Sequence, residues 1–239
     1  METLLKIPYK AFNEDWNLLQ QFLERRGNPR YELVGDLKLN LRTDITSLGN
    51  LFRVYGHLHL HNSSIQSLGN LEYVGGNLDL SYSSIQSLGN LEYVGGYLTC
   101  DDTSIESLGN LQYVGGDLRL NRTSIQSLGN LIRVDGMLHL QHTEIQSLGN
   151  LVRVSGMLYL QHTEIQSLEN LEYVGGNLNL NSTPIQSLGN LEYVGYDLDL
   201  RWCSIKSLGN LQYVGDIIYL SRNHQIPEEQ LTKFKINKL

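Results

Sequence analysis

The sequence has few of the features that mark a disordered, membrane-spanning or secreted chain. Its 239 residues include only four prolines and no low-complexity segment, which argues against disorder. No apolar run approaches the roughly 18 residues of a membrane span. The first residues, METLLKIPYKAFNEDW, lack the apolar core of a signal peptide. We therefore expect a cytoplasmic protein with no membrane partner.

Basic residues are also scarce. Lysine and arginine number 18 against 25 aspartates and glutamates, which gives a net charge of −7 and a pI of about 5.5. An excess of acidic residues disfavours binding to the phosphate backbone of nucleic acids. The sequence therefore predicts no nucleic-acid partner.

What the sequence contains instead is a repeat of twenty residues. A Ser-Leu-Gly-Asn block recurs at this interval from Ser47–Asn50 to Ser207–Asn210, and only the block at Ser167–Asn170 differs, with Glu169 in place of glycine. A fixed period of this length is the mark of a solenoid, in which each unit forms one structural repeat.

One unit, residues 78–97, shows the expected path of a turn. Leu78 and Leu80 alternate with polar residues, which predicts a short strand with one buried face. From Ile85 onward the apolar residues are spaced by three, which favours a 3₁₀ or polyproline-II return over an α-helix. No unit can bury its apolar residues alone, so the units must stack.

These residues resemble the leucine-rich-repeat family. Leu78-Asp79-Leu80 is similar to its LxL strand, and residues 80–85 are similar to the LxxNxL half of its motif, with threonine or serine at most of the asparagine positions. The resemblance covers residues 31–220 and is closest to short, glycine-rich repeats of bacterial and phage proteins. It implies a hydroxyl ladder that bonds neighbouring turns, with Cys203 buried in that column.

The predicted fold is an α/β repeat solenoid: a leucine-rich-repeat-like, right-handed superhelix with one parallel β-sheet of about ten short strands. Its return segments are non-helical and helical caps close both ends. A parallel β-helix is the alternative, because twenty is four times five, but the apolar spacings 2, 5, 3, 3, 3, 4 are not a strict five.

Three segments of a single domain follow from this fold. Residues 1–30 form an N-terminal helical cap, with a helix over residues 13–26 that Asn13 caps; residues 31–220 form the solenoid; and residues 221–239 form a C-terminal cap whose helix begins at Pro227. Cys100 and Cys203 fall five units apart, roughly 25 Å along the stack and beyond disulfide reach, which fits a reducing cytoplasm.

Residues that flank the strand leucines vary from unit to unit, and by alternation they point out of the open sheet face. Large apolar groups exposed there indicate an interface. We predict that Met137, Met157 and Tyr159 form its centre and Trp202 a second anchor. The predicted partner-binding set is completed by Arg119, Arg122, His139, His142 and His162.

The predicted function is therefore protein–protein interaction, with no cofactor. The resemblance suggests a phage or bacterial effector that blocks a host protein by occupancy. The alternative is a structural protein that forms a homo-oligomer through the same face; a nucleic-acid mimic is disfavoured by the arginines on that face. A return-path column of Tyr and Arg, such as Tyr93 and Arg133, is expected to be a structural ladder or else a second binding surface.

No enzyme motif of the GxxxxGK[ST], HExxH or GxSxG type occurs. His57, His59 and His61 lie on one strand face with about 6.7 Å between neighbours, too far apart to share one zinc ion. No acid or cysteine completes a metal site around His139, His142 and His162. We predict neither catalysis nor a metal.

Overall fold

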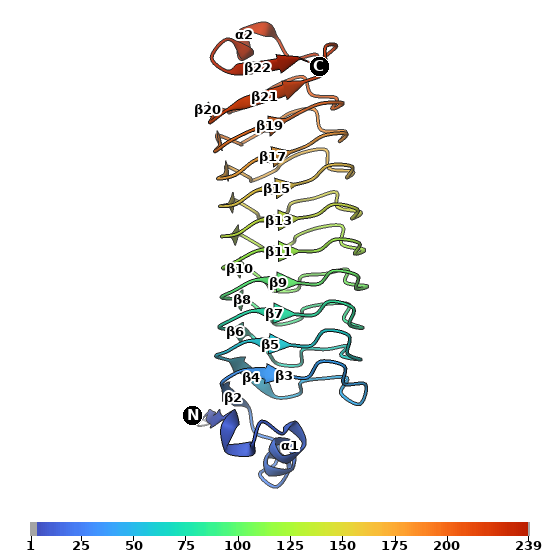
Figure 1. Cartoon of the computed structure of the whole chain (residues 1–239), viewed down its shortest axis with the longest axis vertical. Coiled ribbons are helices and arrows are strands. Elements are labelled where there is room, and N and C mark those ends of the chain that lie inside the picture. The colour runs from blue at the N-terminus through green and yellow to red at the C-terminus, as the bar shows by residue number, and fades with distance from the viewer. Residues whose placement is uncertain (1–3, 239) are drawn as a thin grey trace.

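Each twenty-residue unit forms one turn of a parallel β-solenoid (Figure 1). The computed structural model describes residues 4–238. The turns stack along the long axis of the molecule, with the N-terminal and C-terminal segments at opposite ends (Figure 1). The predicted repeat solenoid with a parallel sheet is confirmed.

One sheet, here called the face sheet, carries the predicted LxL strands. Its eleven parallel strands run in the order β22-β21-β19-β17-β15-β13-β11-β9-β7-β5-β3. Their bounds are β3 Leu37–Lys38, β5 Leu58–His59, β7 Leu78–Asp79, β9 Leu98–Thr99, β11 Leu118–Arg119, β13 Leu138–His139, β15 Leu158–Tyr159, β17 Leu178–Asn179, β19 Leu198–Asp199, β21 Ile217–Leu220 and β22 Lys235–Lys238.

A second sheet, here called the return sheet, lies on the return path. It also has eleven parallel strands, in the order β1-β2-β4-β6-β8-β10-β12-β14-β16-β18-β20. Their bounds are β1 Leu5–Pro8, β2 Tyr31–Val34, β4 Leu51–Val54, β6 Tyr73–Val74, β8 Tyr93–Val94, β10 Tyr113–Val114, β12 Arg133–Val134, β14 Arg153–Val154, β16 Tyr173–Val174, β18 Tyr193–Val194 and β20 Tyr213–Val214.

The expectation of a single sheet was therefore wrong, although the return segments are non-helical as predicted. The spacing of three between Leu88, Leu91 and Val94 arises from corners between short straight segments. Two residues such as Tyr93-Val94 suffice to pair with the turns before and after. Aromatic and β-branched residues also favour a strand at this position.

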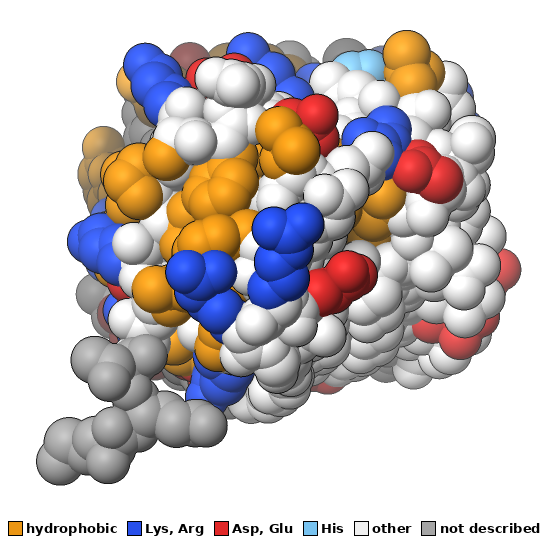
Figure 2. Space-filling view, turned by 90° about the horizontal axis from the view of Figure 1, so that it is seen from below, with side chains coloured by type: hydrophobic (Ala, Val, Ile, Leu, Met, Phe, Trp, Pro, Cys, Tyr) orange, Lys and Arg blue, Asp and Glu red, His pale blue; other side chains and the backbone are white. Residues whose placement is uncertain are grey.

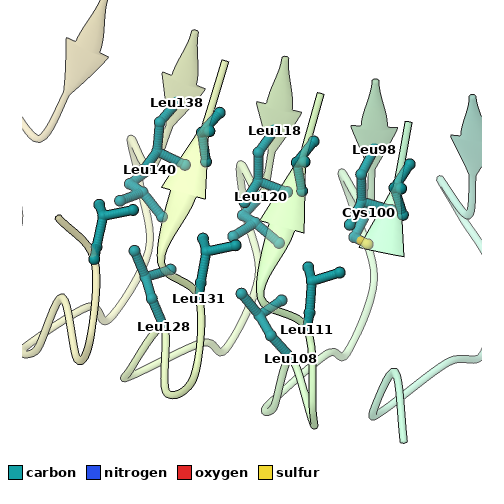
Figure 3. Packing of buried hydrophobic residues seen from close by; sticks show 14 of the residues in the cluster. Leu98, Cys100, Leu108, Leu111, Leu118, Leu120, Leu128, Leu131, Leu138 and Leu140 are labelled. Atoms are coloured by element: carbon teal, nitrogen blue, oxygen red, sulfur yellow. The ribbon is translucent and has the colours of Figure 1, made fainter. Parts of the chain in front are cut away.

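The two sheets enclose one continuous core of leucine, isoleucine and valine. Leu118 and Leu120 in β11 and its exit are fully buried, as are their counterparts in the neighbouring turns. Figure 3 shows these side chains in rows along the stack, with Cys100 in a leucine position. Every row continues from turn to turn, so each turn buries its apolar residues against the turns on either side.

The hydroxyl ladder between turns that the resemblance implied is not formed, and asparagine side chains supply contacts between turns instead. The threonine hydroxyls bond within their own turn; for example, Thr123 Oγ1 donates to Leu120 O at 2.7 Å. The asparagine that ends the four-residue block donates instead to the preceding turn in six of the nine blocks, as Asn170 Nδ2 does to Gly149 O at 2.9 Å. Cys203 is half-buried rather than buried, and its thiol donates to Leu180 O in the preceding turn.

Caps cover both ends, though they are smaller than predicted. At the N-terminal end a 3₁₀ turn, η1 (Tyr9–Phe12), precedes helix α1 (Trp16–Glu24). Asp15, not Asn13, is the N-cap residue, because Asn13 adopts a left-handed conformation that ends η1. Figure 2 views this end and shows apolar side chains beside lysine and arginine. At the C-terminal end, the four-residue helix α2 (Glu228–Leu231) follows Pro227 and leads into β22.

Glycine is required in only some of the Ser-Leu-Gly-Asn blocks. Gly69 and Gly89 both have positive φ, +62° and +57°, but a Cβ at Gly69 would overlap the carbonyl oxygen of Gly49, whereas a Cβ at Gly89 would meet nothing within 4 Å. The difference follows the pairing of the turns, since Ser67 bridges to Ser47 and Ser87 bridges forward to Ser107. Glu169, with a φ of 50°, occupies the block whose serine forms no bridge.

Replacing a core leucine should destabilise the stack strongly. We expect Leu118→Ala to lower the free energy of unfolding by about 2–5 kcal/mol, because it removes fully buried methyl groups and leaves a cavity. Chemical denaturation followed by circular dichroism measures this change. Gln86→Ala, at an exposed position, is the control and should stay within about 0.5 kcal/mol. An unchanged midpoint for Leu118→Ala would contradict the register of β11.

The two glycines offer a matched comparison. Gly89→Ala should cost about 1–2 kcal/mol from its left-handed backbone alone. Gly69→Ala has the same backbone cost plus an overlap with the Gly49 carbonyl, so we expect a clearly larger loss. Parallel denaturation curves of the two variants test this, and equal losses would show that the turns are not paired in alternation.

Candidate functional site

The face sheet fixes the relative positions of the predicted binding residues. Arg119, His139 and Tyr159 occupy the same position in β11, β13 and β15 and pair in register across the sheet. Neighbouring parallel strands lie about 4.8 Å apart, so these side chains form a row along the stack. Such a row is held firmly because each residue sits between two buried leucines of its own turn.

Four of the predicted residues form one cluster, here called the methionine–tyrosine cluster: Met137, His139, Met157 and Tyr159. The rings of His139 and Tyr159 stack with centroids 5.0 Å apart and an interplanar angle of 21°. The Tyr159 hydroxyl lies 2.9 Å from the sulfur of Met157. Met137 is 36% exposed, and the other three side chains are half-buried. The cluster is a mainly apolar patch on the outer surface of the face sheet. The leucines of the same strands are already fully buried beneath it.

The methionines interrupt a hydrogen-bond ladder that the sequence reasoning missed. In six other turns this position holds a residue whose side chain accepts from the backbone N–H of the next turn; for example, Asp117 Oδ1 accepts from Met137 N at 2.8 Å and Asn177 Oδ1 accepts from Asp197 N at 3.1 Å. Tyr97 is a further exception to this ladder. A thioether is a weak acceptor by comparison. Met137 and Met157 therefore give up a stabilising contact, so the fold does not explain their presence.

The rim residues project from the corner that follows each face strand. This corner residue has a positive φ in turn after turn, between 51° at Asn62 and 59° at His142 and His162. The left-handed conformation turns the side chain away from the core, so that His142 and His162 are exposed beside the cluster. The alternation in the sequence placed these side chains correctly, but it did not predict the backbone conformation.

The two predicted arginines lie near the cluster but are already paired. Arg119 Nε contacts Asp101 Oδ2 at 3.1 Å, and Arg122 donates to both oxygens of Asp102 at 2.8 and 3.0 Å. The hydrogen bonds from Arg122 lower the pKa of the Asp102 carboxyl. Both arginines are largely exposed, so each can keep its ion pair and still donate to a partner.

Trp202 is not part of the cluster. It is 67% exposed at the rim of the turn after Ser182, and the polar turn that contains Asn179 and Ser182 separates it from Tyr159. The structure therefore divides the predicted site into the methionine–tyrosine cluster and a separate region around Trp202.

The tyrosines of the return sheet form two ladders of stacked rings. Centroid distances are 4.9 Å for Tyr73–Tyr93 and for Tyr93–Tyr113, and 4.7 Å for Tyr173–Tyr193 and for Tyr193–Tyr213. Arg153 extends the second ladder, because its guanidinium lies 3.6 Å from the centroid of Tyr173. This stacking supports the structural interpretation of the column.

The same two turns that carry the cluster differ on the return sheet as well. Arg133 and Arg153 replace tyrosine there, and Asp135 replaces the usual glycine. Asp135 accepts from Arg133 Nε at 2.6 Å and from the Tyr113 hydroxyl at 2.6 Å, which bridges the break in the ladder. Hydrogen bonding to Arg133 lowers the pKa of Asp135.

Other site chemistries find no support in the described part of the chain. Among residues 4–238, no three His, Cys, Asp or Glu side chains gather so that they could hold a metal ion. Within the same residues no helix has the length and apolar character needed to cross a membrane. Comparisons with protein-family models and with curated proteins return no match to this sequence.

The histidines of the face sheet should make stability depend on pH. Burial, reinforced by Arg119, lowers the pKa of His139 below its usual 6.5, and burial with the nearby His57 lowers that of His59. Below pH 6.5 the unfolded chain thus binds more protons than the folded one, so stability falls as pH decreases from 6.5 through the folded-state pKa values. We expect the thermal midpoint to fall between pH 7 and pH 5, and to fall less in His139→Gln. An identical slope in the variant would contradict this assignment.

Proposed function

We propose that this protein binds another protein through the open side of its face sheet, with the methionine–tyrosine cluster at the centre of the contact. The observation that carries the proposal is the pair of neighbouring methionines at positions where most other turns place a hydrogen-bond acceptor. Methionine, tyrosine and arginine are favoured at the centres of protein interfaces.

The arrangement around the cluster fits such a contact. His142 and His162 provide a polar rim next to the apolar centre, and Arg119 and Arg122 provide exposed donors one turn away. An apolar centre with a polar rim is the usual anatomy of a protein interface. The rigid strands also limit the entropy lost on binding, because the stacked His139 and Tyr159 are already ordered in the free protein.

The shape of this face suits contact with another protein, because the cluster stands on a regular sheet of short parallel strands. The resemblance to short bacterial and phage repeats suggests the concrete version in which the partner is a host protein blocked by occupancy.

Truncating the central tyrosine should weaken partner binding without unfolding the chain. We expect Tyr159→Ala to reduce affinity roughly thirty-fold or more, because an aromatic hot spot contributes about 2 kcal/mol or more. The partner is first captured from bacterial lysates, with and without phage infection, and its dissociation constant for each variant is then measured by calorimetry. The thermal midpoint should change little.

Two controls make the result specific. Tyr219→Ala removes a tyrosine from the same column at the end of the stack, and Glu92→Lys changes charge on the return side; both should leave affinity intact. Loss of binding in Glu92→Lys with no effect of Tyr159→Ala would move the site to the return sheet. A stable homo-oligomer of the free protein that Tyr159→Ala dissociates would instead favour self-assembly.

A further inference from the structure

A pocket of about 480 Å³ lies where the chain leaves the repeat path after β21. In the regular turns a buried isoleucine lies two residues after the position that threonine usually fills, as Ile205 lies two residues after Cys203. In the last turn Gln225 stands at that place and Ile226 is buried instead, so the path is offset by one residue. This offset leaves Cys203 half-buried and opens the space above Leu200.

The pocket gathers residues that depart from the repeat. Lys206 stands where most other turns have glutamine and one has glutamate, and Trp202 is the largest side chain of the rim column. Trp202 is held in place because its backbone N–H donates to Ser221 Oγ at 2.8 Å. Trp202 and Lys206 lie two turns away from the methionine–tyrosine cluster, so the proposed protein contact does not use them.

The charge of the lining is opposite to that of the protein as a whole. None of the residues that line the pocket is aspartate or glutamate, although the chain carries 25 acidic residues. Lys206 is its one permanently charged side chain. Two acidic residues lie beside the lining, and both are paired. Asp199, close to Cys203, has both carboxylate oxygens engaged by Arg201, at 2.9 and 2.6 Å. Glu228, 3.7 Å from His224, accepts from Lys238 Nζ at 2.7 Å. The local environment therefore favours an anionic ligand.

The remaining lining groups are suited to hydroxyl groups. Gln186, Asn223 and Gln225 supply amides that can both donate and accept. His224 also lines the pocket, but its side chain is only 7% exposed: its Nδ1 is buried and its Nε2 lies 3.7 Å from the Glu228 carboxylate, so it shapes the wall and is not counted among the ligand-binding groups. A volume of this size is in the range of small-molecule sites.

We infer that this pocket binds an acidic sugar residue of monosaccharide size. The exposed face of Trp202 offers an apolar surface to the C–H groups of the sugar ring, the amides of Gln186, Asn223 and Gln225 bind its hydroxyls, and Lys206 pairs with its carboxylate. The ligand is either a free uronic acid or the terminal residue of a glycan, since both present the same ring and carboxylate.

Glucuronic acid is the probe, with glucose as its neutral match and inorganic phosphate as a bare anion. The chain has two tryptophans, of which Trp16 is 6% exposed and Trp202 is 67% exposed, so a ligand-dependent change in tryptophan fluorescence reports on the pocket. We expect saturable binding of glucuronic acid with a millimolar dissociation constant, at least about five-fold tighter than glucose. That ratio corresponds to roughly 1 kcal/mol.

Lys206→Gln restores the residue that other turns carry, so it should fold, and it should bind glucuronic acid no better than glucose. Trp202→Ser introduces the rim residue of the preceding turn and should abolish binding, which saturation-transfer NMR detects without the fluorophore. Lys235→Gln, a lysine outside the pocket, should change nothing. Binding of methyl glucuronide as well as the free acid would support a terminal glycan residue, and binding of the free acid alone would support a free monosaccharide.

Three outcomes would overturn the inference. The first is an absence of saturable binding of glucuronic acid up to about 50 mM, a concentration at which millimolar affinity saturates the site. The second is equal binding of glucose and glucuronic acid to the wild type. The third is phosphate binding as tight as that of glucuronic acid, which would reduce the pocket to a simple anion site.

Discussion

Stacking in register, one turn on the next, is the constraint on which the whole structure depends. A single turn exposes its row of leucine, isoleucine and valine to solvent, and only the neighbouring turn removes that surface from water. The period must therefore stay at twenty residues through the stack. Where the first turns depart from it, the pairing of β2 with β4 shows a register shift next to Tyr31, and the regular register resumes at β6.

Much of this could be predicted from the sequence because the repeat exposes the same position many times. The buried columns, the open face and the absence of helix in the return path follow from spacings such as Leu78–Leu80 and Ile85–Leu88. The return sheet was not predicted, because two-residue strands such as Tyr93–Val94 leave no alternation to detect. Whether hydrogen bonds run within a turn or between turns also depends on side-chain geometry, which is why Thr123 bonds within its own turn and the contact that Asn170 makes to the preceding turn was not predicted.

The candidate site illustrates the same limit. Alternation identified Met137, Met157 and Tyr159 as outward-facing, yet it could not show that Asn77 and Asp117 in the same column serve the backbone of the next turn. Because of that contact, a methionine in this column costs the fold a hydrogen bond. The variability of the column alone does not reveal this cost. The grouping also needed coordinates, since Trp202 belongs to a different region from Tyr159.

Because the contacts between turns lie along the long axis, the interfaces carry a pulling force in series, and the tension is the same at each. A chain held at its two ends would therefore yield at its weakest interface rather than all at once, and each released turn would lengthen it by up to roughly 70 Å, the extended length of twenty residues. The break in the tyrosine ladder at Arg133 is bridged by Asp135 in the turns that carry the methionine–tyrosine cluster. Under load, this bridge would help to keep the central turns assembled while the ends peel away.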